Sequence, residues 1–419
     1  MDKLAVASDP KVEAAAIEGV AMVNLAKPGK ETTFQGYSDN IISPMVQKVA
    51  RNCQRVDIVF DTYRKASLKS TTRKKRGKGI RRRVEATSRP PNNWMSFLRI
   101  DENKTELFRF LSESLIHSVP YEIKLLCAFD DKVVSNKDCD LTTLAPCNQE
   151  EGDTRVFLHV LDMATKGIKS AKVRSVDTDV VVIGTSLFDE FGDLEELWVE
   201  FGVGKNKKWY PIHLVYKELG PDVALALLFF HAFTGCDQVS FFGYCGKLKA
   251  WKTWKMFPEV TRTFKMLSNF PTLNHVKDAM PIIEQFVALM YKSTTMSKTV
   301  NEARRELFIK DSRNLENIPP TAASLYQHTL RAAYVAGYVW RQALVAMPTL
   351  PNVENWGWKY DSEIPKPYWT ELPEATTVVR ELIKCNCNPD KGCFGRCKSV
   401  KGDLRCTELC KCNQWRLQN

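Results

Sequence analysis

The sequence predicts an α/β domain with a mostly parallel sheet, followed by a helical region and a small cysteine-rich tail. Three observations lead to this expectation. Short β-branched or apolar segments alternate with helical segments over the first 220 residues, as in parallel α/β sheets. From residue 221 to residue 346 the spacing of apolar residues is mostly helical. After a stretch rich in Pro and Trp, seven of the 13 cysteines fall within residues 385–412.

The individual elements follow from hydrophobic periodicity. Residues 14–25 are apolar and are expected to form a strand that leads into a helix. Further strands are expected at residues 55–60, 122–129, 171–176, 180–183 and 196–202, and further helices at residues 37–52, 105–116 and 150–166. We expect four parts: a domain at residues 1–250 that contains a basic arm at residues 64–83, a helical extension at residues 251–346, a linker at residues 347–384 and the tail at residues 385–412.

The positive charge is concentrated in the basic arm. The chain has a formal net charge of +11, and residues 64–83 contain eleven Lys and Arg but no Asp or Glu. A dense run of cations favours a phosphate backbone, because binding releases condensed counterions. A nuclear-localisation signal or a solvated loop is the alternative, and both roles are compatible. The side chains expected to contact nucleic acid are Lys74, Lys75, Arg81, Arg82 and Arg83.

Membrane and secretory classes are not expected. The first residues lack the apolar core of a signal peptide, and the longest apolar stretch, near residues 223–233, is too short for a bilayer span of about 20 residues. Without a secretory signal, the cysteines are expected to be reduced thiols or metal ligands and not a disulfide framework. We therefore expect an intracellular protein, with the nucleus as its compartment.

Several carboxylates lie where predicted strands end or where predicted helices begin. Parallel sheets gather their sites at the carboxyl ends of strands. Carboxylates that meet there repel one another unless a cation neutralises them, and hard oxygen ligands suit Mg²⁺ or Mn²⁺. Two such ions can activate water for phosphodiester cleavage, whereas helix capping is the alternative role for any single acid. The acids are Asp61, Glu151, Asp153, Asp177, Asp179 and Asp237.

The order of these acids resembles the flap-endonuclease/XPG family of structure-specific nucleases, which has a PIN-like fold. The family's Phe-Asp, Glu-x-Glu, Asp-x-Asp and Gly-Ser-Asp elements correspond to residues 60–61, 151–153, 177–179 and 235–237. The family's first Asp corresponds to Glu18, whose side chain is longer by one methylene, which bears on metal position and activity. The resemblance implies a PIN-like domain in which all seven acids form a two-metal Mg²⁺ or Mn²⁺ site.

Two further stretches carry the same resemblance. Leu-Lys-Ser at residues 68–70 and Lys-Arg at residues 75–76 imply that Lys69 and Arg76 neutralise the scissile phosphate. These two residues are seven apart and therefore share one helix face, although simple membership of the basic run is the alternative. Residues 242–247 are similar to the glycine turn of the family's DNA-binding motif, which implies a phosphate held at a helix start, with ordinary helix capping as the alternative. The residues of that turn are Gly243, Gly246 and Lys247.

Nearly the whole chain also resembles a group of uncharacterised, multicopy animal proteins of mobile-element character. They share the patterns EEADTR, DTDVVVL and HAFTGCD, which correspond to residues 150–155, 177–183 and 231–237. This second resemblance names no reaction.

The tail has the composition of a zinc site. Clustered thiolates suit tetrahedral Zn²⁺, and a disulfide knot is the alternative. The two Cys-x-Cys pairs are too close for a single-zinc knuckle and fit neighbouring metals, so seven thiolates serve about two zincs if one thiolate bridges. The tail resembles the DNA-binding CXC domain of tesmin/TSO1-like proteins, with Ser399 and Trp415 at two of nine ligand-like positions. The expected ligands are Cys385, Cys387, Cys393, Cys397, Cys406, Cys410 and Cys412.

These features together predict a divalent-metal-dependent nuclease that hydrolyses phosphodiester bonds in DNA, with a zinc tail that contacts the nucleic acid. RNA remains open as a substrate. The alternative is a catalytically inactive nucleic-acid-binding protein of mobile-element origin that retains the nuclease fold. An interaction scaffold is the third possibility. Intact acids at six of the seven positions favour the enzyme.

Overall fold

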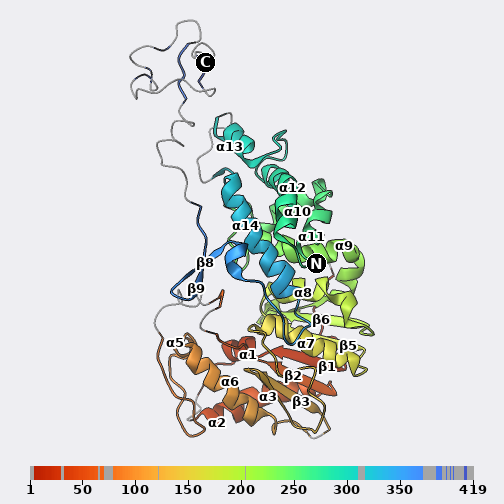
Figure 1. The fold of residues 1–419 in the computed structure, drawn as a ribbon. Helices are drawn as coiled ribbons and strands as arrows, with labels where there is room; N and C mark the ends of the chain where they lie inside the picture. The colour runs from red at the N-terminus through yellow and green to blue at the C-terminus, as the bar shows by residue number, and fades with distance from the viewer. Residues whose placement is uncertain are drawn as a thin grey trace.

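The computed structural model places a sheet domain at one end of the molecule and a helical region beside it (Figure 1). It describes residues 4–29, 33–64, 67–69, 79–120, 122–202, 204–309, 317–370, 384–388, 393, 397, 400 and 410–412. The expected α/β class is confirmed, because a mostly parallel sheet flanked by helices precedes a helical region and a cysteine cluster.

Seven strands form the main sheet. They are β1 (Ala14–Glu18), β2 (Arg55–Val59), β3 (Lys124–Phe129), β4 (Lys132–Ser135), β5 (Ser170–Ser175), β6 (Glu196–Phe201) and β7 (Lys208–Pro211). Their order is β4-β3-β2-β1-β5-β6-β7. The five central strands are parallel, and the edge strands β4 and β7 are antiparallel to their neighbours. The carboxyl ends of β2, β1 and β5 therefore lie side by side at one edge of the sheet.

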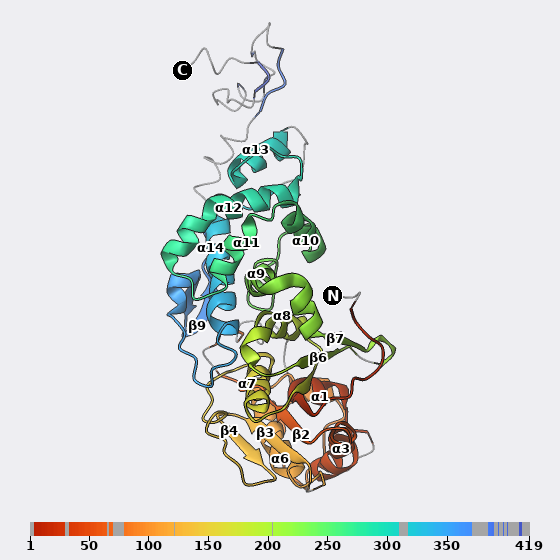
Figure 2. The ribbon, with the colours of Figure 1, turned by 90° about the vertical axis from the view of Figure 1, so that its right-hand side faces the viewer.

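Helices cover both faces of the sheet (Figure 2). The N-terminal helices are α1 (Gly19–Leu25), α2 (Phe34–Tyr37), the π-helix η1 (Ser38–Ile42), α3 (Ser43–Ala50), α5 (Trp94–Phe97) and α6 (Asp101–Leu115). The following helices are α7 (Gly152–Thr165), α8 (Thr178–Ser186) and α9 (Ile212–Phe233), with short 3-10 turns η2 (Phe188–Phe191) and η3 (Gly204–Asn206). Alternate strand residues separate two cores: Ala15 and Ile17 of β1 pack with the N-terminal helices, whereas Ala14 and Ala16 pack with α7, α8 and α9.

One predicted strand is wrong. Residues 180–183 are β-branched and were expected to be extended, but they lie inside α8. The Asp177 side chain accepts a hydrogen bond from the Asp179 N–H at 2.9 Å and so begins a helix there. This helix is buried against α9, so tertiary packing overrides the β-propensity of its valines.

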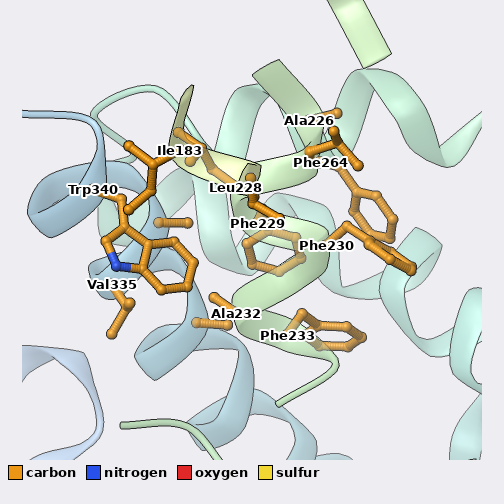
Figure 3. Close-up of a cluster of buried hydrophobic side chains, with 14 of the residues drawn as sticks. Ile183, Ala226, Leu228, Phe229, Phe230, Ala232, Phe233, Phe264, Val335 and Trp340 are labelled. Atoms are coloured by element: carbon orange, nitrogen blue, oxygen red, sulfur yellow. The ribbon is translucent and has the colours of Figure 1, made fainter. Parts of the chain in front are cut away.

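The helical region continues from α9 through α10 (Lys247–Met256), α11 (Val260–Leu267), α12 (Leu273–Tyr291), α13 (Val300–Ile309), α14 (Ala322–Tyr334) and the π-helix η5 (Val335–Trp340). Its core is aromatic, as Figure 3 shows for Phe229, Phe233 and Phe264 of α9 and α11. These side chains belong to the same buried cluster as the sheet residues under α7, so the region and the sheet share one core. Among the helices that the structure describes, none has both the length and the apolar character to span a bilayer.

The expected linker contains a folded segment, which we call the strap (residues 351–370). It includes the 3-10 helix η6 (Val353–Trp356) and the hairpin of β8 (Trp358–Asp361) and β9 (Ile364–Pro367). Trp356 and Trp358 are buried against Tyr334 of α14, with ring centroids 6.1 and 5.4 Å away. Burial of these rings holds the strap on the helical region, which a mere linker would not require.

Candidate active site

The predicted acids meet at the carboxyl edge of the sheet. Glu18 is the last residue of β1, Asp61 lies two residues after β2, and Asp177 lies two residues after β5. Because these strands are neighbours, their three carboxylates come together. The remaining acids lie at two helix starts, α7 and α8, and in the loop after α9; they are Glu151, Asp153, Asp179 and Asp237.

Glu18 is held by a serine of the neighbouring strand. The Ser175 hydroxyl donates to Glu18 Oε2 at 2.6 Å and accepts from the Asp177 N–H at 3.0 Å. Burial raises the pKa of Glu18 to about 7, and the negative charges of Asp61 and Asp177 add to the rise. This carboxyl group therefore keeps its proton to a higher pH than an ordinary glutamate.

Asp61 is fixed by the start of α7. The Gly152 N–H donates to Asp61 Oδ1 at 2.8 Å, and the Tyr63 hydroxyl donates to Asp61 Oδ2 at 3.2 Å. A Cβ at position 152 would lie 3.0 Å from Asp61 Oδ1 and 3.5 Å from Glu18 Cγ. The glycine of the Glu-Gly-Asp element thus leaves room for two carboxylates to approach the same helix start.

Glu151 and Lys69 form a buried ion pair at this edge. Lys69 Nζ lies 2.9 Å from Glu151 Oε2 and 3.8 Å from Asp237 Oδ2. The other oxygen of Glu151 accepts from the Gln238 side-chain amide at 2.8 Å. Burial raises the pKa of Glu151 to about 7 although Lys69 opposes this rise. Burial also opposes the charge of Lys69, but its carboxylate neighbours hold the pKa of this amine well above its usual range.

Asp153 is the least compensated acid of the site. Its side chain is on the first turn of α7 and the residue is only 8% exposed. Within the described part of the chain, its Oδ1 has no hydrogen-bond partner. Burial raises the pKa of Asp153 well above its usual range, and Glu18, Asp177 and Asp61 add to the rise. A buried carboxylate oxygen without a donor, beside three other carboxylates, fits a cation ligand.

Asp179 differs from its neighbours because a histidine supports it. The His231 ring Nε2 lies 2.8 Å from Asp179 Oδ1. Burial disfavours the charged form of Asp179, but the hydrogen bond and the charge of His231 outweigh it and lower the pKa of this carboxyl group. Asp177 lies two residues before Asp179. Burial and the negative charge of Asp179 raise the pKa of Asp177. His231 in turn packs against Trp340, with ring centroids 5.7 Å apart, so its orientation is fixed.

The donor set fits divalent cations of the Mg²⁺ or Mn²⁺ type. All of the candidate ligands are carboxylate oxygens, which such hard cations prefer. The seven acids are electrostatic neighbours around this edge of the sheet, although among the described residues no three of their oxygens lie within 4.8 Å of one another. Four of the acids have a raised pKa, which indicates burial and repulsion that a cation would relieve.

The structure places the predicted basic residues unevenly. Lys69 is at the acidic site, whereas Lys74, Lys75 and Arg76 lie outside the described residues. Arg81 pairs with Glu106 and donates to Asn103 Oδ1 at 2.9 Å, which fixes this end of the arm on α6. Arg82 and Arg83 are exposed.

The predicted glycine turn has a partly internal role. Gly246 is the N-cap of α10, and Gly243 lines a cavity described below. The Lys247 ammonium donates to the carbonyls of His231 and Gly235, at 2.8 and 2.6 Å, and to the Thr234 hydroxyl at 3.2 Å. Lys247 therefore binds the carboxyl end of α9, and this internal role was not expected from the sequence.

The cysteine tail gathers its thiols as two groups that share one member. One group contains Cys385, Cys387, Cys393 and Cys397, and the other contains Cys385, Cys410 and Cys412; within each group the sulfurs lie within 4.8 Å of one another. Cys406 lies outside the described residues. Among the described residues, no cysteine is in a disulfide bond. Thiols at this mutual distance fit a soft or borderline metal ion such as Zn²⁺.

Three supporting residues were not predicted from the sequence as parts of the site: Ser175, His231 and Gln238. His231 lies within an apolar helix and Gln238 in a turn, and neither spacing indicates a hydrogen bond to a carboxylate. Ser175 could have been found, because it is the last residue of the strand that precedes Asp177.

Comparisons with known proteins add little at the sequence level. No protein-family model matches the chain, and no curated protein matches it in sequence. Among solved structures, one similar chain is a bacteriophage T5 flap endonuclease, crystallised as a pseudo-enzyme–product complex with DNA and metal ions. It superposes with a TM-score of 0.33 at 10% sequence identity, covering 77% of this chain and 99% of that chain. A similarity of this size carries no weight for the function of the present protein.

Proposed function

We propose that this protein is a divalent-metal-dependent nuclease that hydrolyses phosphodiester bonds in DNA. The observation that carries the proposal is the gathering of seven acids around the carboxyl edge of the parallel sheet, where a buried oxygen of Asp153 has no donor among the described residues. Such a site is costly in the absence of a cation, because like charges are held together away from water.

Two Mg²⁺ or Mn²⁺ ions would supply the activated water and the stabilisation of the leaving oxygen. The residues that would hold them are Glu18, Asp61, Glu151, Asp153, Asp177, Asp179 and Asp237. Ser175, Gln238 and His231 each hydrogen-bond one of these carboxylates and so fix its orientation.

Lys69 would neutralise the scissile phosphate. Its ammonium lies between Glu151 and Asp237, at the side of the acidic cluster. If Glu151 held a divalent ion, Lys69 would no longer be needed as its counterion, and the ammonium of Lys69 would be available to pair with a phosphate oxygen. Arg76 would act beside it, on the part of the arm that follows.

A second function is favoured by two observations. Glu18 stands where the resemblance has an Asp, and the Lys69 ammonium pairs with two of the acids as a metal would. An inactive protein that binds nucleic acid could use Lys69 as a permanent counterion. The two candidates differ in turnover and not in nucleic-acid binding.

The cysteine tail is proposed to hold about two zincs and to contact DNA. Cys385 belongs to both thiol groups, so it is the thiolate that would bridge the two ions. The described tail residues have almost no apolar core beyond the cysteines themselves, so metal binding would supply its folding energy.

One experiment separates the two candidate functions. The full chain is incubated with labelled flap, single-stranded and duplex DNA and with RNA of the same sequence, in Mg²⁺, Mn²⁺ or EDTA, and binding is measured on the same samples. The nuclease proposal expects metal-dependent cleavage of at least one DNA substrate. Metal-independent binding with no cleavage of any substrate, in either metal, would establish the inactive binder.

A further inference from the structure

A cavity lies beside the loop that follows Asp237. It has a volume of about 310 Å³, and we call it the aromatic groove. Its walls include Phe241 from the loop and Tyr368 and Trp369 from the strap, and Arg304 and Arg331 also line it. A cavity of this size is at the lower end of the range for small-ligand sites.

The aromatic rings of the groove face solvent to an unusual degree. Phe241 is 77% exposed and Trp369 is 69% exposed. The neighbouring Phe242 is buried against Phe233 and His328, with ring centroids 5.0 and 4.8 Å away, which anchors the loop. On the other wall the Thr370 and Ser324 hydroxyls lie 3.0 Å apart and tie the strap to α14. Both exposed rings therefore project from anchored backbone. Exposed aromatic rings held in this way can stack on a planar ligand.

The described lining of the groove carries positive charge. Among the residues that the structure describes, none that lines the groove is an Asp or a Glu. Arg331 is 5% exposed and binds the Gly357 carbonyl at 2.9 Å, and Arg304 binds the carbonyl of Pro319. Among the described residues, neither guanidinium has a carboxylate partner. Burial lowers the pKa of Arg331 to about 10. A buried cation without a counterion favours an anion nearby.

The groove is close to the acidic site. Gly235 has φ +114°, and a Cβ built on it would lie 2.8 Å from the Cβ of Phe241. The loop therefore folds back and places Phe241 beside Gly235, only two residues before Asp237. Two residues span at most about 7 Å of chain. A nucleic-acid strand at the acidic site would thus reach the ring of Phe241 within about two nucleotides.

We infer that the aromatic groove binds a single-stranded segment of nucleic acid, with bases stacked on Phe241 and Trp369 and a phosphate near Arg304. The inference rests on the proposed function for its direction, because the bound strand is the one that continues from the acidic site. Exposed aromatic rings with nearby cations are the features that bind unpaired bases without sequence preference. In a duplex the faces of the bases are already stacked, so these rings would gain nothing. A proline-rich peptide would use the rings but would leave the arginines without an anion.

Binding of a fluorescein-labelled oligo-dT to the full chain in EDTA tests the inference. Base stacking on an aromatic side chain is worth roughly 5- to 150-fold in affinity per ring. The double variant Phe241→Ala/Trp369→Ala should therefore lose at least about 20-fold, whereas Phe241→Tyr should retain affinity because the ring remains. Phe270→Ala removes an exposed ring outside the groove and should leave affinity unchanged. Arg304→Gln should reduce the slope of log affinity against log salt by about 0.7.

Two outcomes would overturn the inference. One is an unchanged affinity of the double variant for oligo-dT, and the other is an equal loss for duplex DNA of the same length. Tight binding of a proline-rich peptide, with no binding of oligo-dT, would assign the groove to a protein partner instead. The binding is measured in EDTA and so does not depend on cleavage. Failure of the nuclease proposal would appear separately, as absent cleavage in Mg²⁺ and Mn²⁺ while binding of oligo-dT persists.

Discussion

Two aspartates on α7 provide a matched test of the metal site. Asp153 and Asp162 are both buried on the same helix, at 8% and 3% exposure. Asp162 is saturated: it accepts from the Thr143 hydroxyl at 2.5 Å and pairs with Arg55 at 2.7 Å and Lys166 at 2.9 Å. Asp153 has an oxygen without a hydrogen-bond partner in the described part of the chain and lies among other carboxylates. The same substitution should therefore change stability in opposite directions at the two positions.

In the absence of metal, Asp153→Asn should stabilise the fold by about 1–3 kcal/mol at pH 8, since it removes a buried charge that Lys69 offsets only in part. Asp162→Asn should destabilise it by about 3–5 kcal/mol, because the buried Arg55 loses a partner. Added Mg²⁺ should stabilise the wild type by about 3 kcal/mol at 100 times its dissociation constant. The Asp153→Asn variant should gain much less.

Urea unfolding of the full chain at pH 8, in EDTA and in Mg²⁺, measures these differences. The m-value should stay constant, so that changes in the midpoint report stability. A loss of stability for Asp153→Asn comparable to that for Asp162→Asn, together with an undiminished gain from Mg²⁺, would refute the view that Asp153 is an uncompensated metal ligand.

Further predictions concern titration, charge and zinc. Glu18 and Glu151 have a pKa of about 7 in the fold against an ordinary 4.5, so between these pH values the folded state holds protons that the unfolded chain releases. The stability of the metal-free protein should therefore fall as the pH rises from about 4.5 to about 7. Thermal unfolding measures this fall, and Mg²⁺ should remove it. Replacing Lys74, Lys75, Arg81, Arg82 and Arg83 by Gln should flatten the salt slope of DNA binding by roughly one unit per lost phosphate contact, and an unchanged slope would restrict the arm to targeting. Native mass spectrometry should find about two zincs per chain under reducing conditions, and Cys385→Ser should reduce both sites while Cys139→Ser, outside the tail, should reduce neither.

The sequence predicted most of the sheet because the signal there is local. The strand at β2 and the helix at α7 follow from their periodicity, and their bounds differ by only one or two residues from those expected. The edge strands β4 and β7 were missed, since each has only four residues and no clear alternation. The strap was taken for a linker because its composition is rich in Pro and Trp. Its order comes from packing on α14, which no local pattern reports.

The candidate acids could be predicted as a set because the carboxyl ends of neighbouring parallel strands must meet. What the sequence could not provide is the difference between them. Asp179 is hydrogen-bonded by His231 and has a lowered pKa. Asp153 has a raised pKa, and its Oδ1 has no donor among the residues that the structure describes. Both differences depend on side chains distant in sequence. At Lys247 the resemblance implied a phosphate held at a helix start, which stays a prediction; the contact of its ammonium with the end of α9 could not be read from the sequence.

Single-turnover cleavage by Asp177→Asn/Asp179→Asn tests the central claim most directly. The wild type and this variant are compared on the same labelled DNA in Mn²⁺, at protein concentrations at which a parallel binding measurement shows the DNA to be saturated. If the carboxylate cluster holds the catalytic ions, the variant should bind DNA as tightly as the wild type, and its cleavage rate should fall by at least about a thousandfold, which corresponds to roughly 4 kcal/mol of lost transition-state stabilisation. Cleavage by the saturated variant at the wild-type rate would contradict the account, because the phosphodiester would then be hydrolysed without the carboxylates to which the metal site is assigned.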